Sequence, residues 1–94
     1  MTKPKTLTFE NRAWEKAKHP RYVSEILKIS ETEERTFEIS YHYVEQKHYV
    51  ETYKTQIKSN GYKETYADFK LFDSLNECFD YVQKTYNIKT IRKG

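Results

Sequence analysis

Apolar and polar residues alternate strictly along residues 37–43. The large apolar or aromatic positions are Phe37, Ile39, Tyr41 and Tyr43. A period of two is typical of a β-strand that presents one face to a core or to a partner. The pattern therefore predicts a strand over residues 36–44. The first question about function is whether the face that carries these rings packs in the core or binds a partner.

A second pattern, with helical spacing, occurs near the C-terminal end. Its apolar positions are Leu75, Cys78, Phe79, Val82 and Tyr86. Residues three and four apart share one face of a helix, so these positions form a single apolar stripe. Ser74 and Glu77 have the spacing of a capping box, and Asp73 is an alternative N-cap. We predict an amphipathic helix over residues 75–86, with Asn87 near its end.

Strands and turns are predicted for most of the remaining chain. Residues 22–29 are rich in β-branched and apolar side chains, and the polar run 30–35 is expected to be a turn. A second turn at 45–47 leads into a strand over 49–58. Asn60-Gly61 is the strongest hairpin signal, and a strand over 62–72 should follow it. Residues 6–10 are a weaker strand candidate, and 11–18 a short-helix candidate that ends before Pro20.

Residues 48–59 allow two interpretations. Tyr49, Val50, Tyr53 and Ile57 also have helical spacing, and Gly61 could serve as a left-handed helix cap. The threonines and tyrosines in this segment favour a strand, which we adopt.

The predicted turns set a register. A three-residue turn at 45–47 pairs Ile39 with Tyr53, and a type I′ turn at Asn60-Gly61 places Lys58 opposite Lys63. One face would then hold Phe37, Ile39, Tyr41, Tyr43, Tyr49, Tyr53, Ile57, Tyr66 and Phe72. The other would hold His42, Thr52, Lys54, Gln56, Lys58, Lys63 and Thr65, with Val44, Val50, Phe69 and Leu71 at one end. The expected fold is α+β: a single small domain, residues 1–94, with an antiparallel meander of four to five strands and the C-terminal helix packed on one face.

Composition narrows the class of protein. Charged residues make up 33% of the chain and aromatic residues 16%, which excludes a disordered polyelectrolyte. The net charge of +3 permits an anionic partner without requiring one. A single cysteine, Cys78, excludes an intrachain disulfide, and the basic residues 1–5 are not followed by the apolar run of a secretory signal. No segment is apolar for long enough to span a bilayer. We expect a cytoplasmic protein with no membrane partner.

Candidate chemistry is sparse. Cys78 lies on the apolar stripe of the predicted helix, which indicates a buried structural thiol rather than a nucleophile. His19, His42 and His48 lack the spacing of a metal site. With only two glycines, the chain has no phosphate-binding loop. We therefore predict no catalytic residue, no metal and no cofactor, and a protein that is not an enzyme.

Two surfaces are candidates for binding. One is basic and combines the tip of the predicted hairpin with the C-terminal tail, and the other is the tyrosine-rich sheet face. The candidate binding residues are Lys54, Lys58, Tyr62, Lys63, Lys84, Lys89, Arg92 and Lys93. Like charges directly opposite one another, as expected for Lys58 and Lys63, suggest an anionic partner.

Two functions fit these features. The abundance of lysine and tyrosine, with few alanines and glycines, is typical of AT-rich coding sequence in a low-GC bacterium or its phage. We expect a non-enzymatic protein-binding module, in its concrete form a phage or mobile-element inhibitor that blocks a host protein such as a CRISPR-type defence nuclease (an anti-CRISPR, anti-defence protein). The alternative is a module that binds RNA or single-stranded DNA through lysines and stacking tyrosines.

Overall fold

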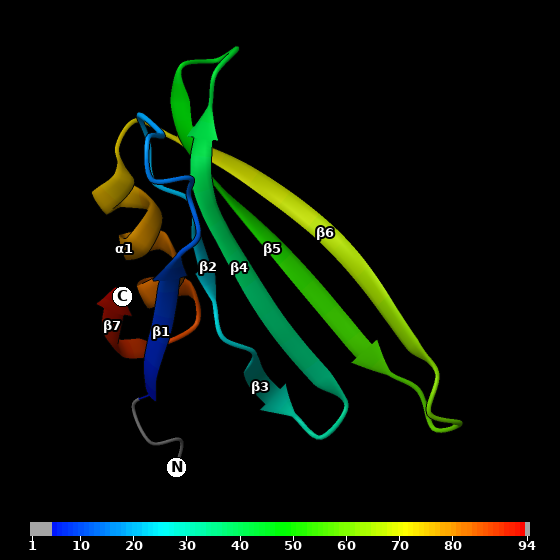
Figure 1. Cartoon of the computed structure of the whole chain (residues 1–94). Helices are drawn as coiled ribbons and strands as arrows, with labels where there is room; N and C mark the ends of the chain where they lie inside the picture. The colour runs from blue at the N-terminus through cyan, green and yellow to red at the C-terminus, as the bar shows by residue number, and fades with distance from the viewer. Residues whose placement is uncertain (1–4, 94) are drawn as a thin grey trace.

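The computed structural model describes residues 5–93; residues 1–4, most of the basic N-terminal segment discussed above, and residue 94 lie outside the described part. Within residues 5–93, seven strands form one sheet, and one helix packs on it (Figure 1). The elements are β1 (Lys5–Asn11), β2 (Tyr22–Ser24), β3 (Leu27–Ser30), β4 (Glu33–His42), β5 (Lys47–Ile57), β6 (Lys63–Phe72), α1 (Leu75–Thr85) and β7 (Ile88–Lys93).

The sheet has the order β6-β5-β4-β2-β1-β7, and β3 also pairs with β4. An α+β fold with a C-terminal helix is therefore confirmed, but the sheet has seven strands rather than four or five. It is also mixed, because β7 runs parallel to β1 while the other pairs are antiparallel. The sequence pattern missed β7, which reaches the sheet only after α1 has crossed it, as parallel pairing requires.

The predicted strand over residues 22–29 is two strands. Ser24 is buried at the break, where its hydroxyl accepts a hydrogen bond from the Phe37 N–H at 2.9 Å and donates to the Glu25 carbonyl at 2.8 Å. A side chain thus replaces a bond of the sheet ladder, and β2 and β3 both pair with β4 on either side of this point. The short helix predicted over residues 11–18 is wrong, because this segment is a loop closed by a bond from the Arg12 N–H to the Arg21 carbonyl.

The helix prediction is confirmed almost to the residue. The Ser74 hydroxyl accepts from the Glu77 N–H at 3.2 Å, and the Glu77 carboxylate accepts from the Ser74 N–H at 3.0 Å, which makes the predicted capping box. The buried side of α1 carries Cys78, Phe79 and Val82. The core is completed from the sheet by Leu7, Phe9, Leu27, Phe37, Ile39, Val50 and Ile88.

Residues 47–57 form a strand, as adopted, but the predicted register of β4 and β5 is wrong. The turn has four residues, 43–46, because Gln46 takes a left-handed conformation with φ 54°. Ile39 therefore pairs with Val50 rather than Tyr53. The shift is odd, and successive side chains of a strand point to opposite faces, so Tyr49 and Tyr53 leave the core face and Val50 joins it.

The β5–β6 turn also differs from the prediction. Only Gly61 has a positive φ there, at 85°, so the turn is not type I′. The Asn60 side chain instead accepts from the Tyr62 N–H at 3.0 Å, and the Lys58 N–H donates to the Tyr62 carbonyl at 2.7 Å. Lys63 pairs with Ile57 and not with Lys58. This second odd shift offsets the first, so β6 keeps Tyr66 and Phe72 on the core face as predicted.

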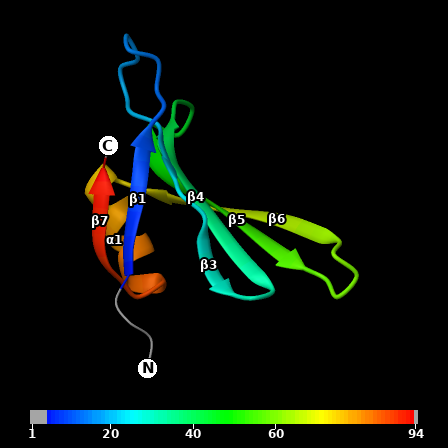
Figure 2. The same ribbon diagram turned by 60° about the horizontal axis from the view of Figure 1, so that its bottom comes forward.

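Helix α1 covers only part of one face. It packs on β5, β6 and β7, and its Phe79 ring also contacts Phe9 of β1 and Tyr22 of β2. The far halves of β4, β5 and β6 extend away from it (Figures 1 and 2). The molecule is accordingly elongated, with extents of 42 × 28 × 22 Å. Two surfaces of the sheet are thus left without a helix over them: the extended arm and the whole face opposite α1.

Candidate binding surface

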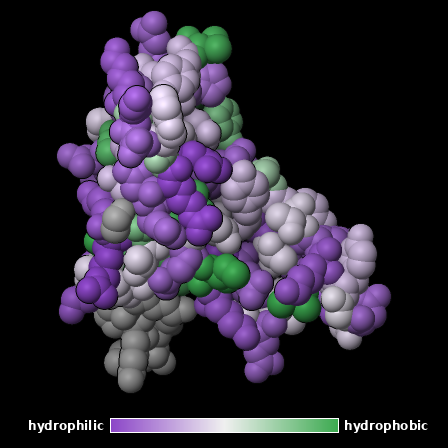
Figure 3. All heavy atoms as spheres, viewed as in Figure 1, coloured by the Kyte–Doolittle hydropathy of each residue, from purple (hydrophilic) through white to green (hydrophobic). Residues whose placement is uncertain are grey.

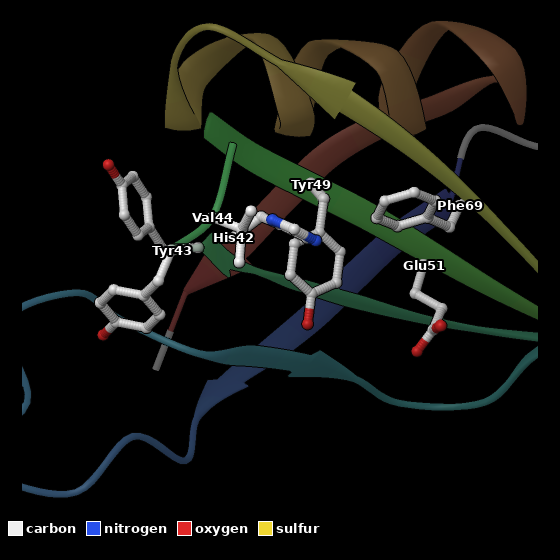
Figure 4. Close-up of a pocket in the computed structure, with 7 residues that line it drawn as sticks. His42, Tyr43, Val44, Tyr49, Glu51 and Phe69 are labelled. Carbon is white, nitrogen blue, oxygen red and sulfur yellow. The ribbon is translucent and has the colours of Figure 1, made fainter. Parts of the chain in front are cut away.

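Three rings from adjacent strands meet on the sheet face opposite α1. They are His42 of β4, Tyr49 of β5 and Phe69 of β6, called here the open-face cluster. The ring centroids lie 6.2 Å apart for His42 and Tyr49, 5.5 Å for Tyr49 and Phe69, and 6.0 Å for His42 and Phe69. In Figure 4 the Tyr49 ring projects from β5 away from α1, with His42 beside it. Phe69 remains 47% exposed, so the cluster presents apolar surface to solvent.

The open-face cluster lines a shallow depression of about 470 Å³ at the end of the β4–β5 hairpin. Tyr41, Tyr43, Val44 and Glu51 complete its lining. Val44 is 85% exposed at the hairpin tip. The space-filling view shows hydrophobic atoms at the surface of this end of the molecule (Figure 3). Large exposed apolar side chains beside a depression are more typical of a contact surface than of ordinary surface.

An acidic network borders the open-face cluster. The Tyr53 hydroxyl donates to the Glu51 carboxylate and lies 3.5 Å from the Glu38 carboxylate. The hydrogen bond to Glu51, followed by burial and the two negative charges, raises the pKa of Tyr53. Glu38 is held on its other side by the Arg21 guanidinium, whose pKa is raised mainly by that hydrogen bond. The Glu38 side chain is only 12% exposed, so its carboxylate is largely shielded from solvent between these two partners.

The predicted hairpin lysines do not form one patch. On the α1 side of the sheet, the Lys54 ammonium lies 3.4 Å from the Glu33 carboxylate. The Lys58 ammonium lies 3.5 Å from Glu64, which also accepts from the Tyr66 hydroxyl at 2.6 Å. Lys63, opposite Ile57, belongs to the other face. The expected facing pair of Lys58 and Lys63 is thus wrong, and two of the three charges already have carboxylate partners.

The remaining candidate residues are spread over the molecule. Tyr62 is 62% exposed in the β5–β6 turn. Lys84 lies in the last turn of α1, and Lys89, Arg92 and Lys93 belong to β7. Since β6 and β7 form opposite edges of the sheet, the hairpin and the C-terminal residues do not combine into one basic surface. The Lys93 ammonium lies 4.4 Å from the centroid of the Phe79 ring, in a cation–π contact.

A second aromatic group lies at the same end of the sheet, toward the α1 side. His19, from the 12–20 loop, stacks on Tyr41 with centroids 3.7 Å apart, and His48 packs edge-on against Tyr41 at 5.1 Å. Burial, and then the nearby His19, lowers the pKa of His48. These rings anchor the loop to the β4–β5 hairpin.

Cys78 is fully buried, as predicted, and burial raises the pKa of its thiol to about 12. Within residues 5–93, no three His, Cys, Asp or Glu side chains are grouped so that they could hold a metal ion. No helix in this part of the chain is long and apolar enough to cross a membrane.

The chain matches no protein-family model, no curated protein and no solved structure. What this protein does must therefore be inferred from its own side chains.

Sequence reasoning placed His42 and Phe69 together but missed Tyr49 and Glu51 as their neighbours, because these depend on the β4–β5 register. Glu38 shares a face with His42 through the alternation of β4 alone, but it was not singled out. One signal was present: Phe69 and Leu71 were expected, with Val44 and Val50, at an apolar end of a face that is otherwise polar. Apolar residues on an uncovered face are a cue for a contact surface.

Proposed function

We propose that this chain is a non-enzymatic protein-binding module that contacts its partner through the open-face cluster and its acidic border. One observation carries the proposal: the His42, Tyr49 and Phe69 rings are assembled from three strands on a face without a helix over it. Aromatic side chains are enriched at protein interfaces because they offer a large contact area with few rotatable bonds.

The charges near these rings favour a protein over a nucleic acid. A site that stacks bases also needs cations to neutralise phosphates. Here the open-face cluster is bordered by the carboxylates of Glu51 and Glu38. The two neighbouring cations already have carboxylate partners: the Arg21 guanidinium is paired with Glu38, and the Lys47 ammonium, opposite His42, lies 3.3 Å from the Asp73 carboxylate. These carboxylates would repel a phosphate backbone, and Lys54 and Lys58 point to the other face of the sheet.

The same chemistry describes the partner. An apolar side chain would fill the depression, and an arginine or lysine beside it would meet the faces of Tyr49 and Phe69 and the Glu51 carboxylate. In its concrete form, we propose a phage or mobile-element inhibitor that acts in the cytoplasm on a host protein such as a CRISPR-type defence nuclease. This finer form is supported by small size and composition, and not by any feature of the open face.

The test is a comparison of two matched variants. Phe69→Ser removes a ring from the open-face cluster, and Tyr66→Ser removes an exposed ring from the opposite face of the same strand. Each purified protein is immobilised and exposed to a lysate of a low-GC bacterium, with and without nuclease treatment. We expect a captured protein that survives nuclease, is retained by Tyr66→Ser and is lost with Phe69→Ser. Capture that disappears with nuclease, or that is equal for the two variants, contradicts the proposal.

A further inference from the structure

We propose that β6 is a dimerisation edge, which pairs antiparallel with β6 of a second copy of this chain about a two-fold axis at Phe69. This inference does not rest on the open-face proposal, because it is argued from the backbone and the register of the edge strand, although the Phe69 ring takes part in both. β6 is the last strand of the sheet on its side and pairs with β5 over ten consecutive residues without a shift in register (Figures 1 and 2). A long, regular edge strand is a template for another strand.

The β5–β6 turn shows which residues of β6 direct their backbone N–H and C=O groups to the free edge. The Lys58 N–H donates to the Tyr62 carbonyl, so Tyr62 directs its backbone groups toward β5. Alternation along an antiparallel strand then directs those of residues 63, 65, 67, 69 and 71 to the free edge. Phe69 supports this assignment, because its N–H donates to the adjacent Asp68 carboxylate at 2.9 Å and not to β5. A second strand would thus find a row of donors and acceptors at alternate residues.

The side chains of β6 select the register. An axis at Asp68 would place two Asp68 carboxylates opposite each other, which is unfavourable. An axis at Ala67 would place Glu64 opposite Lys70, but it would set the polar Thr65 against Phe69 of the second copy and Lys63 against Leu71. Each of these two axes therefore sets like charges, or polar and apolar side chains, opposite one another.

An axis at Phe69 places opposite charges next to each other and apolar side chains next to apolar side chains. Asp68 lies opposite Lys70 of the second copy, and the symmetry produces this pair twice. Within residues 5–93, neither Asp68 nor Lys70 takes part in an ion pair. The Lys70 ammonium instead lies 5.0 Å from the Tyr81 ring centroid, on the same face as Asp68.

The apolar residues follow the same symmetry. Tyr66 lies opposite Phe72 of the second copy, Ala67 opposite Leu71, and the two Phe69 rings meet on the axis. On pairing, the Phe69 N–H exchanges the Asp68 carboxylate for the Phe69 carbonyl of the second copy, which frees Asp68 for Lys70. An edge contact of this length is smaller than the roughly 1,200 Å² of standard interfaces, so we expect affinity in the micromolar range.

Charge reversal tests both the dimer and its register. Sedimentation equilibrium of the wild type between about 10 µM and 1 mM should show the mass rising from 11.4 kDa toward twice that value. Asp68→Lys alone and Lys70→Asp alone each set like charges opposite one another and should stay monomeric. A 1:1 mixture of these two variants should dimerise again, since every pair across the axis then has opposite charges.

The backbone is tested with Ala67→Pro and the matched control Ala67→Val. Proline removes an N–H that faces the free edge and takes no part in the β5 ladder, so the fold should persist while the dimer is lost. Valine should leave the dimer in place. Circular dichroism checks that each variant is folded. A wild type that stays monomeric to about 1 mM, single charge variants that dimerise like the wild type, or a mixture that stays monomeric would overturn the proposal.

Discussion

Aromatic rings lie on both faces of the sheet, but the two faces bury them to very different degrees. On the α1 side, Phe37 is fully buried and Phe79 is 5% exposed, whereas Phe69 on the opposite face is 47% exposed. Phe79 contacts Phe9 and Tyr22 across the helix–sheet boundary, with ring centroids 5.1 and 5.4 Å apart. In the described part of the chain, the ring contacts of Phe69 are with His42 and Tyr49 on its own face. The first arrangement holds the fold together, and the second leaves apolar surface available to a partner.

The largest effect is expected on the free energy of unfolding, when phenylalanine is replaced by alanine on each of the two faces. Phe79→Ala removes a buried ring and should lower the free energy of unfolding by about 3–5 kcal/mol, a large part of the stability of a small domain. Phe69→Ala removes a half-exposed ring and should cost less than about 1 kcal/mol. Urea denaturation of the two variants measures the difference. Similar losses for both would show that the open face also contributes to the core.

The next prediction concerns the buried thiol under the helix. Cys78→Ala should lower the free energy of unfolding by about 1–2 kcal/mol through lost packing. The native thiol should react slowly with a thiol reagent at pH 7, because Cys78 is fully buried and its pKa is raised to about 12. Denaturant should restore fast labelling. Rapid labelling of the folded protein would place Cys78 outside the covered face.

The covered face was far more predictable from sequence than the open face. Helix α1 follows from local information: the stripe of Cys78, Phe79 and Val82 and the capping box at Ser74 lie within one segment. The strand identities of β4, β5 and β6 likewise follow from local alternation. Their relative register does not, because it depends on the lengths of two turns.

Those turns explain why the candidate site was only partly predicted. The β4–β5 turn gains a residue because Gln46 adopts a left-handed conformation, which is uncommon for a residue other than glycine or asparagine. That single residue moves Tyr49 onto the face of His42 and Phe69. In the β5–β6 turn, Asn60 acts through its side chain rather than through a positive φ, and the expected Lys58–Lys63 pair is lost. β7 depends on pairing with β1, more than 70 residues away in sequence, and no local pattern carries that information.

A smaller effect should come from His48, at the end of the sheet where the 12–20 loop meets the β4–β5 hairpin. Its pKa is lowered in the folded state, by burial and then by His19, so the unfolded chain binds the proton more tightly. The stabilising contribution of neutral His48 is therefore present above the unfolded pKa of about 6.5 and is lost as the pH falls below it. Comparing the free energy of unfolding of the wild type and His48→Gln from pH 8 to 5 measures this. A difference in the free energy of unfolding between the two proteins that stays constant from pH 8 to 5 would contradict this prediction.

The smallest expected effect concerns the binding of nucleic acid. It tests whether the lysines of the β5–β6 arm, rather than the open face, bind the partner. We expect labelled RNA and single-stranded DNA of mixed sequence to bind more weakly than about 1 µM at 0.15 M salt, with the residual affinity falling further as salt is raised. The Lys54/Lys58/Lys63→Gln triple variant should change this affinity little, since Lys54 and Lys58 are paired with Glu33 and Glu64, and Lys63 lies on the other face of the sheet.

Glutamine is used because a new carboxylate at position 54 or 58 would stand beside Glu33 or Glu64 and disturb the fold. A matched Lys84/Lys89/Arg92→Gln variant removes the same number of charges near the opposite edge of the sheet. Sub-micromolar binding at 0.15 M salt that the hairpin variant abolishes and the matched variant retains would overturn the protein-binding proposal, because the arm lysines would then bind phosphate despite their carboxylate partners.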